Sequence, residues 1–497
     1  MHSGILVIHP ADNVAIALRP LAAGAAVHAD GVSVTLVADI PCGHKFARRP
    51  IAAGEAVLKF GQPIGRATAD IPAGTWVHVH NVRTTLDGVL DYTYSPQPPA
   101  PLPERPALTF DGYVRPDGEV GVRNELWIIP TVGCVNEIAQ RVAREFRERS
   151  LPAGVDGVHA FTHPYGCSQL GADHAATQQI LAGLARHPNA AGVLVIGLGC
   201  ENNTMASFRQ LLPGVDSGRY RFLVVQEAAD EIADGLRLLG ELAQDAARCR
   251  REPLPLSRLR VGLKCGGSDG FSGLTANPLV GAFSDLLVAQ GGTSVLTEVP
   301  EMFGAEALFL NRCVSRAVFD DCVAMINGFK EYFQRYNQVV YENPSPGNKD
   351  GGITTLEEKS LGCLQKGGTS RVVAVLPYAG RLQERGLNFL TGPGNDIVSL
   401  TALAASGAHL ALFTTGRGTP LGGPVPTVKI ASNSALAARK PGWIDFDAGR
   451  LIDGATLPEL AEELLQHVVA LASGRARTRN EENGFREIAI FKDGVTL

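Results

Sequence analysis

The segment that most restricts the fold of this chain is Ala191–Asn203, with the sequence AGVLVIGLGCENN. Its run of valine, leucine and isoleucine is typical of a strand that is buried on both faces of a parallel sheet. The strand ends in Gly-Leu-Gly, and a cysteine, a glutamate and two asparagines follow directly. Because ligands of open α/β sheets bind outside the carboxyl ends of the strands, these polar residues are predicted to lie at a binding edge.

Three more apolar segments of the chain lead into a cysteine in the same way. They are ELWIIPTVGC, GVHAFTHPYGCSQ and LRVGLKCGGSD, which carry Cys134, Cys167 and Cys265. Such a thiol can be buried packing, a nucleophile or a metal ligand. His163 lies close before Cys167, but no acyl-transfer signature such as G-x-S-x-G accompanies the pair. Because soft thiolates together with imidazole suit iron or zinc, metal binding is favoured over a nucleophile, with packing as the alternative.

Length and composition indicate an ordinary globular protein. A chain of 497 residues is too long for one core and predicts two or three domains. The net charge of -5 gives no basic surface for nucleic acid. Nine cysteines without a C-x-x-C pair favour reduced thiols. With no segment like a signal peptide and no apolar run of about 20 residues, we expect a cytoplasmic protein without a membrane partner.

Residues 1–95 repeat a short unit in which an aliphatic residue, a glycine and an apolar residue follow at intervals of three. The units are Leu21-Gly24-Val27, Ile40-Gly43-Phe46, Ile51-Gly54-Val57 and Ile71-Gly74-Val77. Glycine turns between apolar residues predict short strands and a compact β domain without a long helix.

This predicted β domain also carries a dense set of polar side chains. They are His9, Asp12, Asn13, His44, Lys45, His78 and His80. The last two histidines share one face of an extended segment. They are a weak metal signal, because four ligands at a recognisable spacing are missing.

A proline-rich linker at 96–107 is predicted to end the β domain, since the segment SPQPPAPLPERPA holds six prolines. An α/β domain at 108–250 is expected next, because apolar strands alternate there with helical patterns. The expected elements are an apolar strand in Leu126–Val132, an amphipathic helix through Ile138, Val142 and Phe146, strands at Gly157–His163 and Ala191–Gly199, a helix at Ala172–Arg186, and a strand at RFLVVQ.

A second, shorter linker is expected around Cys249–Ser257, followed by a C-terminal α/β domain at 257–497 with strands at Leu259–Lys264, Arg371–Leu376 and His409–Phe413. Its loops are long and rich in glycine, which is typical of functional loops. In TTGRGTPLGG, exposed amides and Arg417 suit a carboxylate, although a plain connector is the alternative. The loop PSPGNKDGG adds Asn348 and Lys349 as similar candidates.

Long and unusual strings throughout the chain resemble the altronate and galactarate dehydratase family. They are IHPADNVA, PCGHKFA, VGVRNELWIIPTVGCVN, YGCSQLG, VIGLGCENN, CGGSDGFSGLTANP, LTEVPEMFGAE, YENPSPGNKDGGITTLEEKSLGC, TTGRGTPLGG, PTVKIASNS and REIAIFKDGVTL. The matches run from the β domain to the last residue, so the resemblance covers essentially the whole chain.

The resemblance implies a β-clip domain of the SAF type followed by two α/β regions. It also implies a hydro-lyase that dehydrates D-altronate to 2-dehydro-3-deoxy-D-gluconate in galacturonate breakdown, with ferrous iron or another divalent cation such as Mn²⁺. The strings WVHVHN, SLGC around Cys363 and the GVTL terminus resemble the altronate branch. Galactarate or another aldaric or aldonic acid is the alternative substrate.

Such a reaction removes a proton next to a carboxylate, so the site needs a base, an acid and positive charge for the intermediate. We expect iron to be held by some of Cys167, Cys200, His9 and His44, with Cys134 and Cys265 in reserve. The predicted base is His44 or Lys45 and the predicted acid is His163. Predicted substrate contacts are Arg417, Lys349, Asn348, Ser268, Asp269, Glu201 and Asn202. These roles require the β domain, or that of a partner subunit in a homo-oligomer, to cover the α/β sheet edge.

Two other interpretations remain open from the sequence. The β domain could bind sugar acids without catalysis, with the α/β part as a scaffold. Alternatively, Cys167, Cys200 and Cys363 could hold an iron–sulfur cluster with one iron open to substrate, although the C-x-x-C spacing of common clusters is absent.

Overall fold

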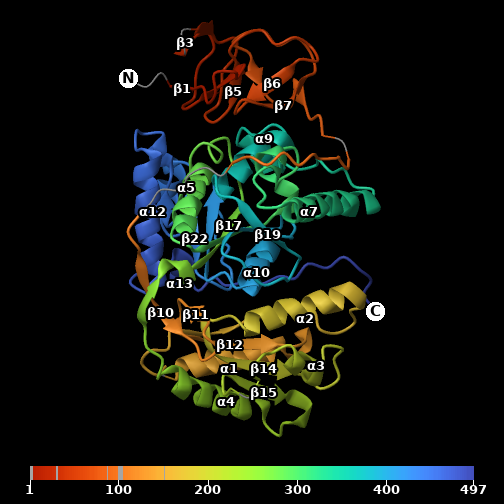
Figure 1. Cartoon of the computed structure of the whole chain (residues 1–497), viewed down its shortest axis with the longest axis vertical. Coiled ribbons are helices and arrows are strands. Elements are labelled where there is room, and N and C mark those ends of the chain that lie inside the picture. The colour runs from red at the N-terminus through yellow and green to blue at the C-terminus, as the bar shows by residue number, and fades with distance from the viewer. Residues whose placement is uncertain (1–3, 30–31, 87, 99–104, 150, 216) are drawn as a thin grey trace.

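The structure is a computed structural model that describes residues 4–29, 32–86, 88–98, 105–149, 151–215 and 217–497. An N-terminal β module is followed by two α/β regions with parallel sheets, so the predicted fold class is confirmed. The C-terminal region lies between the β module and the second region (Figure 1). Residues 99–104 of the predicted proline-rich linker lie outside the described residues. Among the described helices, none has the length and apolar character needed to cross a membrane.

Short antiparallel strands build the β module, as the glycine-centred unit predicts. They are β1 (Ile5–Leu6), β2 (Val14–Ala17), β3 (Ala26–Ala29), β4 (Val32–Thr35), β5 (Lys45–Ala47), β6 (Ala56–Lys59), β7 (Gln62–Ala67), β8 (Trp76–Val77) and β9 (Val82–Arg83). Gly24, Gly43, Gly54 and Gly74 all adopt φ between 79° and 81°, a left-handed turn conformation. Bridges join Leu21 to Ile40 and Ile51 to Ile71, so each repeated unit is a turn that closes a strand pair.

A small antiparallel sheet ties the start of the second region to the segment that leads into the C-terminal region. Strand β10 (Thr109–Val114) pairs with β11 (Val120–Gly121) and with β16 (Glu252–Pro255). Strand β16 lies in the segment expected to be a second linker, so this segment is tied into a sheet. Its two prolines are compatible with an edge strand, where one side needs no backbone donor.

The second region contains a four-stranded parallel sheet of order β13-β12-β14-β15. Its strands are β12 (Glu125–Pro130), β13 (Gly157–Ala160), β14 (Ala190–Gly197) and β15 (Tyr220–Val224), and its helices are α1 (Asn136–Glu148), α2 (Gly171–Ala185), α3 (Met205–Gln210) and α4 (Glu231–Ala246). Helices α1 and α4 pack on one face of this sheet. The strands and helices expected from the sequence are thereby confirmed, although β13 stops at Ala160, before His163.

The C-terminal region contains a seven-stranded parallel sheet of order β19-β20-β18-β17-β21-β22-β23. The strands are β17 (Arg260–Cys265), β18 (Thr293–Leu296), β19 (Val372–Leu376), β20 (Gly386–Leu390), β21 (Leu410–Thr415), β22 (Thr427–Ala431) and β23 (Phe446–Asp447). The helices are α5 (Ala276–Ala289), α6 (Ala307–Leu310), α7 (Arg316–Arg335), α8 (Pro346–Asp350), α9 (Leu356–Cys363), α10 (Asp396–Ser406), α11 (Ser434–Arg439), α12 (Leu457–Ala472) and α13 (Arg479–Asn483).

One apolar core lies between the two parallel sheets. It includes Trp127 and Val195 from the second region, and Val295 and Phe413 from the C-terminal region. Helices α2 and α10 pack against each other within this layer. The two α/β regions therefore share buried surface and form one packed body, with the β module lying against the C-terminal region at the opposite end (Figure 1).

Candidate metal centre and neighbouring cavities

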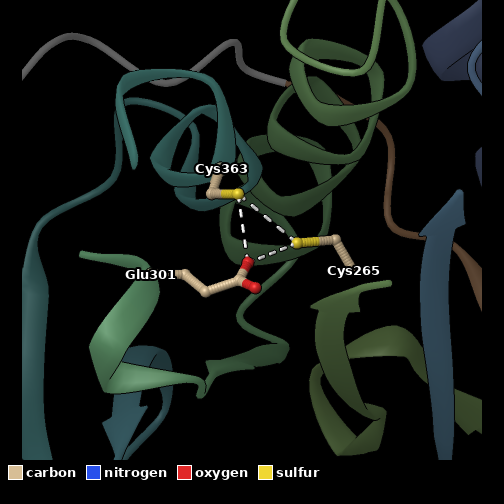
Figure 2. A group of neighbouring side chains, drawn as sticks. All are labelled: Cys265, Glu301 and Cys363. Carbon is tan, nitrogen blue, oxygen red and sulfur yellow. Dashed lines mark hydrogen bonds between the residues drawn. The ribbon is translucent and has the colours of Figure 1, made fainter. Parts of the chain in front are cut away.

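Two cysteines and a glutamate meet inside the C-terminal region (Figure 2). Cys265 ends strand β17, Glu301 lies in the short 3₁₀ turn after β18, and Cys363 ends helix α9. The two sulfur atoms are 3.4 Å apart. A carboxylate oxygen of Glu301 lies 2.8 Å from the Cys265 sulfur and 3.1 Å from the Cys363 sulfur.

Two buried lysines surround this group with positive charge. Lys366 donates a hydrogen bond to the Cys265 sulfur at 2.9 Å, and Lys359 donates one to Glu301 at 2.8 Å. Burial would raise the pKa of Glu301, but the ammonium groups of Lys359 and Lys366 lower it to about 2. Glu301 is therefore a carboxylate at neutral pH.

Further buried charged residues lie next to the group of Cys265, Glu301 and Cys363. Glu298 accepts hydrogen bonds from the Cys265 backbone N–H at 2.8 Å and from Lys264 at 3.0 Å. Lys264 also binds Asp396 at 2.5 Å. Glu298 has φ of 71°, a left-handed conformation that costs a non-glycine residue energy and is concentrated at functional sites. Burial raises the pKa of Glu298 to about 7.

This arrangement can bind a metal ion. Among the described residues, Cys265, Glu301 and Cys363 form the group whose ligand atoms all lie within 4.8 Å of one another. Two thiolates and one carboxylate are ligands that zinc and iron accept, and three protein ligands leave a position open, as in catalytic sites. The hydrogen bond with Cys363, together with burial, raises the pKa of Cys265, so binding of an ion would release thiol protons.

The β module reaches the C-terminal region through a buried ion triad. Lys45 and Lys59 donate hydrogen bonds to opposite oxygens of Glu358, each at 2.8 Å. Lys45 also binds Thr354 and the backbone oxygen of Gly352. Burial lowers the pKa of Lys45 to about 8, although Glu358 acts in the opposite direction. The two ammonium groups outweigh burial at Glu358 and lower its pKa to about 2.

His44 stands beside the triad with both ring nitrogens engaged. Its Nδ1 accepts a hydrogen bond from the Trp76 indole at 3.2 Å, and its Nε2 lies 3.2 Å from the backbone oxygen of Asp350. The ring is therefore neutral, with its proton on Nε2, and burial lowers its pKa. His78 stacks on Trp76, and burial lowers the pKa of His78 to about 4.

Three cavities surround the thiol group and the triad. A narrow one of about 10 Å³, close to the volume that one water needs, has Lys59, Glu358, Lys359 and Cys363 in its wall. A cavity of about 380 Å³ is lined by Glu301, Lys359, Asp396, Asn348 and an aromatic wall of Phe329, Tyr332, Phe333 and Phe491. A third, of about 400 Å³, is lined by Cys42, Asp269, Asp350, Arg417 and Asn433 among others.

The substrate contacts predicted in the C-terminal region divide between these cavities and structural roles. Arg417 is exposed at the 400 Å³ cavity, and among the described residues its guanidinium has no hydrogen-bond partner. The Asn348 side chain caps α8 and donates to the backbone oxygen of Ser268 at 2.8 Å. The Asp269 carboxylate is saturated by donors from its own loop and from Ser432 and Asn433. Lys349 is half-buried beside Asn348.

The remaining predicted residues lie elsewhere, mostly in the second region. Cys167, Cys200 and Asn202 are exposed there, while His163 and Glu201 are buried. His163 Nε2 lies 2.8 Å from the backbone oxygen of Pro130, and its Nδ1 accepts from the Tyr165 N–H. His9 closes an exposed turn with Asp12 in the β module. The structure thus does not bring Cys167 and Cys200 together with His9 and His44, because the two regions lie at opposite ends of the molecule (Figure 1).

Several residues around the thiols were absent from the predicted site. Glu298 and Glu301 follow the strand β18 directly, in TEVPE, so the strand-end pattern that selected Cys265 would also have selected them. Lys359 and Lys366 come from α9 and the turn after it, and so does Cys363, which the sequence suggested only as a ligand of the alternative iron–sulfur cluster. Helical residues give no comparable signal, because only the tertiary fold places them beside β17.

Comparison with known proteins assigns all three regions to one family. Models of the altronate/galactarate dehydratase SAF domain, of the second domain of D-galactarate dehydratase/altronate hydrolase, and of the C-terminal domain of D-galactarate/altronate dehydratase match residues 3–85, 112–247 and 256–496. The altronate dehydratase of Escherichia coli strain K12 is 55% identical over 99% of both chains. The chain belongs to the D-galactarate/altronate dehydratase family. Relatives named for different substrates differ clearly in their sequence identity to this chain. The altronate dehydratase of Bacillus subtilis strain 168 is 51% identical over 99% of both chains. The L-threo-forming galactarate dehydratase of Escherichia coli is 36% identical, over 97% of this chain and 96% of its own length.

Proposed function

We propose that this member of the D-galactarate/altronate dehydratase family is an altronate dehydratase, a hydro-lyase that converts D-altronate to 2-dehydro-3-deoxy-D-gluconate and water. The observation that carries the proposal is the full-length identity of 55% and 51% to two altronate dehydratases, against 36% to a galactarate dehydratase. Galactarate is the alternative substrate.

The chemistry sets clear demands on the site. A base must take the C2 proton, which is weakly acidic because the adjacent carboxylate already carries charge. Positive charge must therefore stabilise the aci-carboxylate that forms, and the C3 hydroxyl must leave as water. Buried lysines beside a cavity that binds the sugar acid would supply this positive charge.

We assign the substrate to the cavity of about 380 Å³, which falls in the size range of small-molecule sites. Glu301 and Lys359 lie in its wall, so the cavity adjoins the thiol–carboxylate group. The Lys359 ammonium would face the substrate carboxylate, and burial of this lysine beside Glu301 strengthens its charge contacts. Asn348 and Asp396 supply polar groups for hydroxyls.

Cys265, Cys363 and Glu301 would hold the divalent ion, and Fe²⁺ is the ion we propose. When bound, such an ion would act as a Lewis acid towards the substrate carboxylate or hydroxyl. Anaerobic removal of metal with a chelator should abolish turnover, and Fe²⁺ should restore it. The variants C265S and C363S should each lose about one iron per chain relative to the wild type, measured by elemental analysis. The exposed C42S is the control, and full iron content in both buried variants would contradict the assignment.

We retain Lys45 as the proposed base, because a pKa of about 8 leaves part of the amine neutral near physiological pH. Its partner Glu358 lies in the wall of the narrow cavity, and Lys359 lines both that cavity and the substrate cavity. We therefore propose that one water in the narrow cavity carries the proton from the substrate to the Lys45–Glu358 pair. His44 is less suited, since the Trp76 indole occupies the ring nitrogen that has a lone pair.

Lys45→Arg tests the base directly, because arginine keeps the charge towards Glu358 but stays protonated. We expect kcat to fall by about a hundredfold or more. Lys59→Arg changes the other ammonium of the same triad and should keep most of the activity. In the wild type, kcat/KM for D-altronate should rise with pH through about 8, as Lys45 loses its proton. Wild-type turnover in Lys45→Arg would contradict the assignment, and the pH profile tests it if that variant does not fold.

Substrate choice is tested by a panel of D-altronate, galactarate and mannonate, each with and without Fe²⁺. Release of 2-keto acid from D-altronate should exceed that from the other acids. A higher kcat/KM for galactarate would favour the alternative, and no 2-keto acid from any of them would contradict dehydratase activity.

A further inference from the structure

Three exposed cysteines of the second region take no part in the buried thiol group. Cys134, Cys167 and Cys200 lie in the loops after β12, β13 and β14, which are neighbours in the sheet. Cysteine is among the most frequently buried residue types. Exposure of one thiol in each of three adjacent loops at the same sheet edge therefore points to a ligand.

Hydrogen bonds join the three loops to one another next to the cysteines. The Gly133 N–H donates to the backbone oxygen of Tyr165 at 2.8 Å, which joins the Cys134 loop to the Cys167 loop. The Asn203 N–H donates to the backbone oxygen of Gly166 at 2.9 Å, and the Ser168 N–H donates to the Asn202 side chain at 2.9 Å. These bonds join the Cys167 loop to the Cys200 loop.

Two glycines allow this close approach of the loops. A Cβ on Gly166, which has φ of +99°, would lie 2.0 Å from the backbone oxygen of Thr131. A Cβ on Gly133 would lie 2.8 Å from the backbone oxygen of His163. Both glycines directly precede a cysteine, so the backbone contacts fix where Cys134 and Cys167 leave their loops.

The surroundings favour a negatively charged ligand with sulfur or oxygen acceptors. Cys134 and Cys167 come shortly before the first residues of the helices α1 and α2, and helix N-termini favour negative charge. Gln226 donates to the Cys200 sulfur at 3.6 Å. The Nε2 of Gln169, a residue only 3% exposed, has no hydrogen-bond partner among the described residues. This amide lies two positions after Cys167 and can serve as a donor to an added acceptor.

The distances between the three sulfur atoms distinguish a site for a single metal ion from a site for a cluster of several irons. A single ion binds each sulfur at about 2.3 Å, which requires the three sulfurs to lie close together. Among the described residues, these three thiols do not form a group within 4.8 Å of one another. In an iron–sulfur cluster each thiolate binds a different iron, so the sulfurs lie farther apart.

We propose that Cys134, Cys167 and Cys200 bind three irons of a four-iron–four-sulfur cluster at this sheet edge. The thiols bind as thiolates and release their protons, and the fourth iron has no cysteine ligand from these loops. The site is separate from the Cys265 group and does not rest on the proposed dehydratase activity.

The test measures the cluster itself and needs no substrate. The full chain, purified anaerobically, is incubated with ferric iron, sulfide and dithiothreitol, which supplies the electrons for assembly, and is then desalted. We expect about four acid-labile sulfides per chain and about four irons in addition to the one proposed at the Cys265 group, with broad visible absorption that bleaches on reduction. One iron per chain without labile sulfide would overturn the proposal.

Single variants locate the cluster. C134S, C167S and C200S should each lose most of the labile sulfide and of the visible absorption. C42S removes another exposed thiol, in the β module, and C265S removes a thiol of the buried group, so both should keep the cluster. Circular dichroism checks that every variant is folded. A cluster that persists in the three loop variants, or that disappears in C265S alone, would overturn the assignment.

Discussion

At the scale of single residues, Glu358 carries much of the contact between the β module and the rest of the chain. Its two oxygens bind Lys45 and Lys59, which belong to strands β5 and β6, and all three side chains are at most 4% exposed. Removal of one partner from a buried ion pair leaves an uncompensated charge in a medium of low dielectric constant. Here the removal of one carboxylate leaves two such charges.

Glu358→Gln should therefore destabilise the protein by about 3–5 kcal/mol, because both ammonium groups lose their counter-ion. Glu55→Gln is the control, since Glu55 pairs with Arg49 at a surface position where both side chains are at least one-third exposed. A surface pair of this kind contributes about 1 kcal/mol or less. Urea unfolding followed by tryptophan fluorescence near Trp76 measures the difference, and equal effects of the two substitutions would contradict the expected role of Glu358.

At the scale of elements, the loops that follow the strands determine where functional groups meet. The left-handed Gly166 lets the loop after β13 lie against Thr131 at the end of β12. Gly171, at the start of α2, also has positive φ, at +53°, but a Cβ there would meet no atom within 4 Å. Alanine substitutions at the two glycines therefore separate the energetic cost of the left-handed backbone conformation from the cost of the steric contact with Thr131.

Gly171→Ala should cost about 1–2 kcal/mol, the usual penalty for a left-handed alanine. Gly166→Ala adds a clash with the Thr131 backbone oxygen and should cost clearly more, roughly 3 kcal/mol or above. It should also displace Cys167, which changes the rate at which the exposed thiols react with a disulfide reagent. Equal loss of thermal stability in the two variants would mean that the loop moves away freely.

The same elements explain what the sequence could and could not predict. The strand β14 and the position of Cys200 after it follow from local apolar patterning, which needs no knowledge of the rest of the fold. The partners of Cys265 do not follow from such patterns. Cys363 is 98 residues away along the chain, at the end of a helix, and reaches Cys265 only because the tertiary fold brings the end of α9 to the end of β17. The thiols predicted as one metal site therefore belong to two separate places.

At the scale of the whole molecule, the two α/β regions are joined by a buried layer that contains a neutral histidine. His187 of the second region is fully buried and stacks on Trp127. Its Nε2 lies 3.0 Å from the backbone oxygen of Ala408 in the C-terminal region, and its Nδ1 accepts from the Asn189 N–H. Burial lowers the pKa of His187 to about 3, because an imidazolium here would lose its hydration.

This histidine should make the junction sensitive to acid. Its pKa is about 6.5 when unfolded and about 3 when folded, so the unfolded chain binds the proton first. Stability is fully present above pH 6.5 and falls as the pH decreases towards 3. The contribution of one such group between pH 6.5 and pH 4 is on the order of 3 kcal/mol. His187→Gln keeps a donor and an acceptor but cannot titrate, so its unfolding free energy should depend less steeply on pH in this window. His80→Gln, at an exposed position, should leave the wild-type slope unchanged. An unaltered slope in His187→Gln would show that other groups cause the acid sensitivity, whereas a reduced slope would identify protonation of His187, in the layer between the two sheets, as a cause of it.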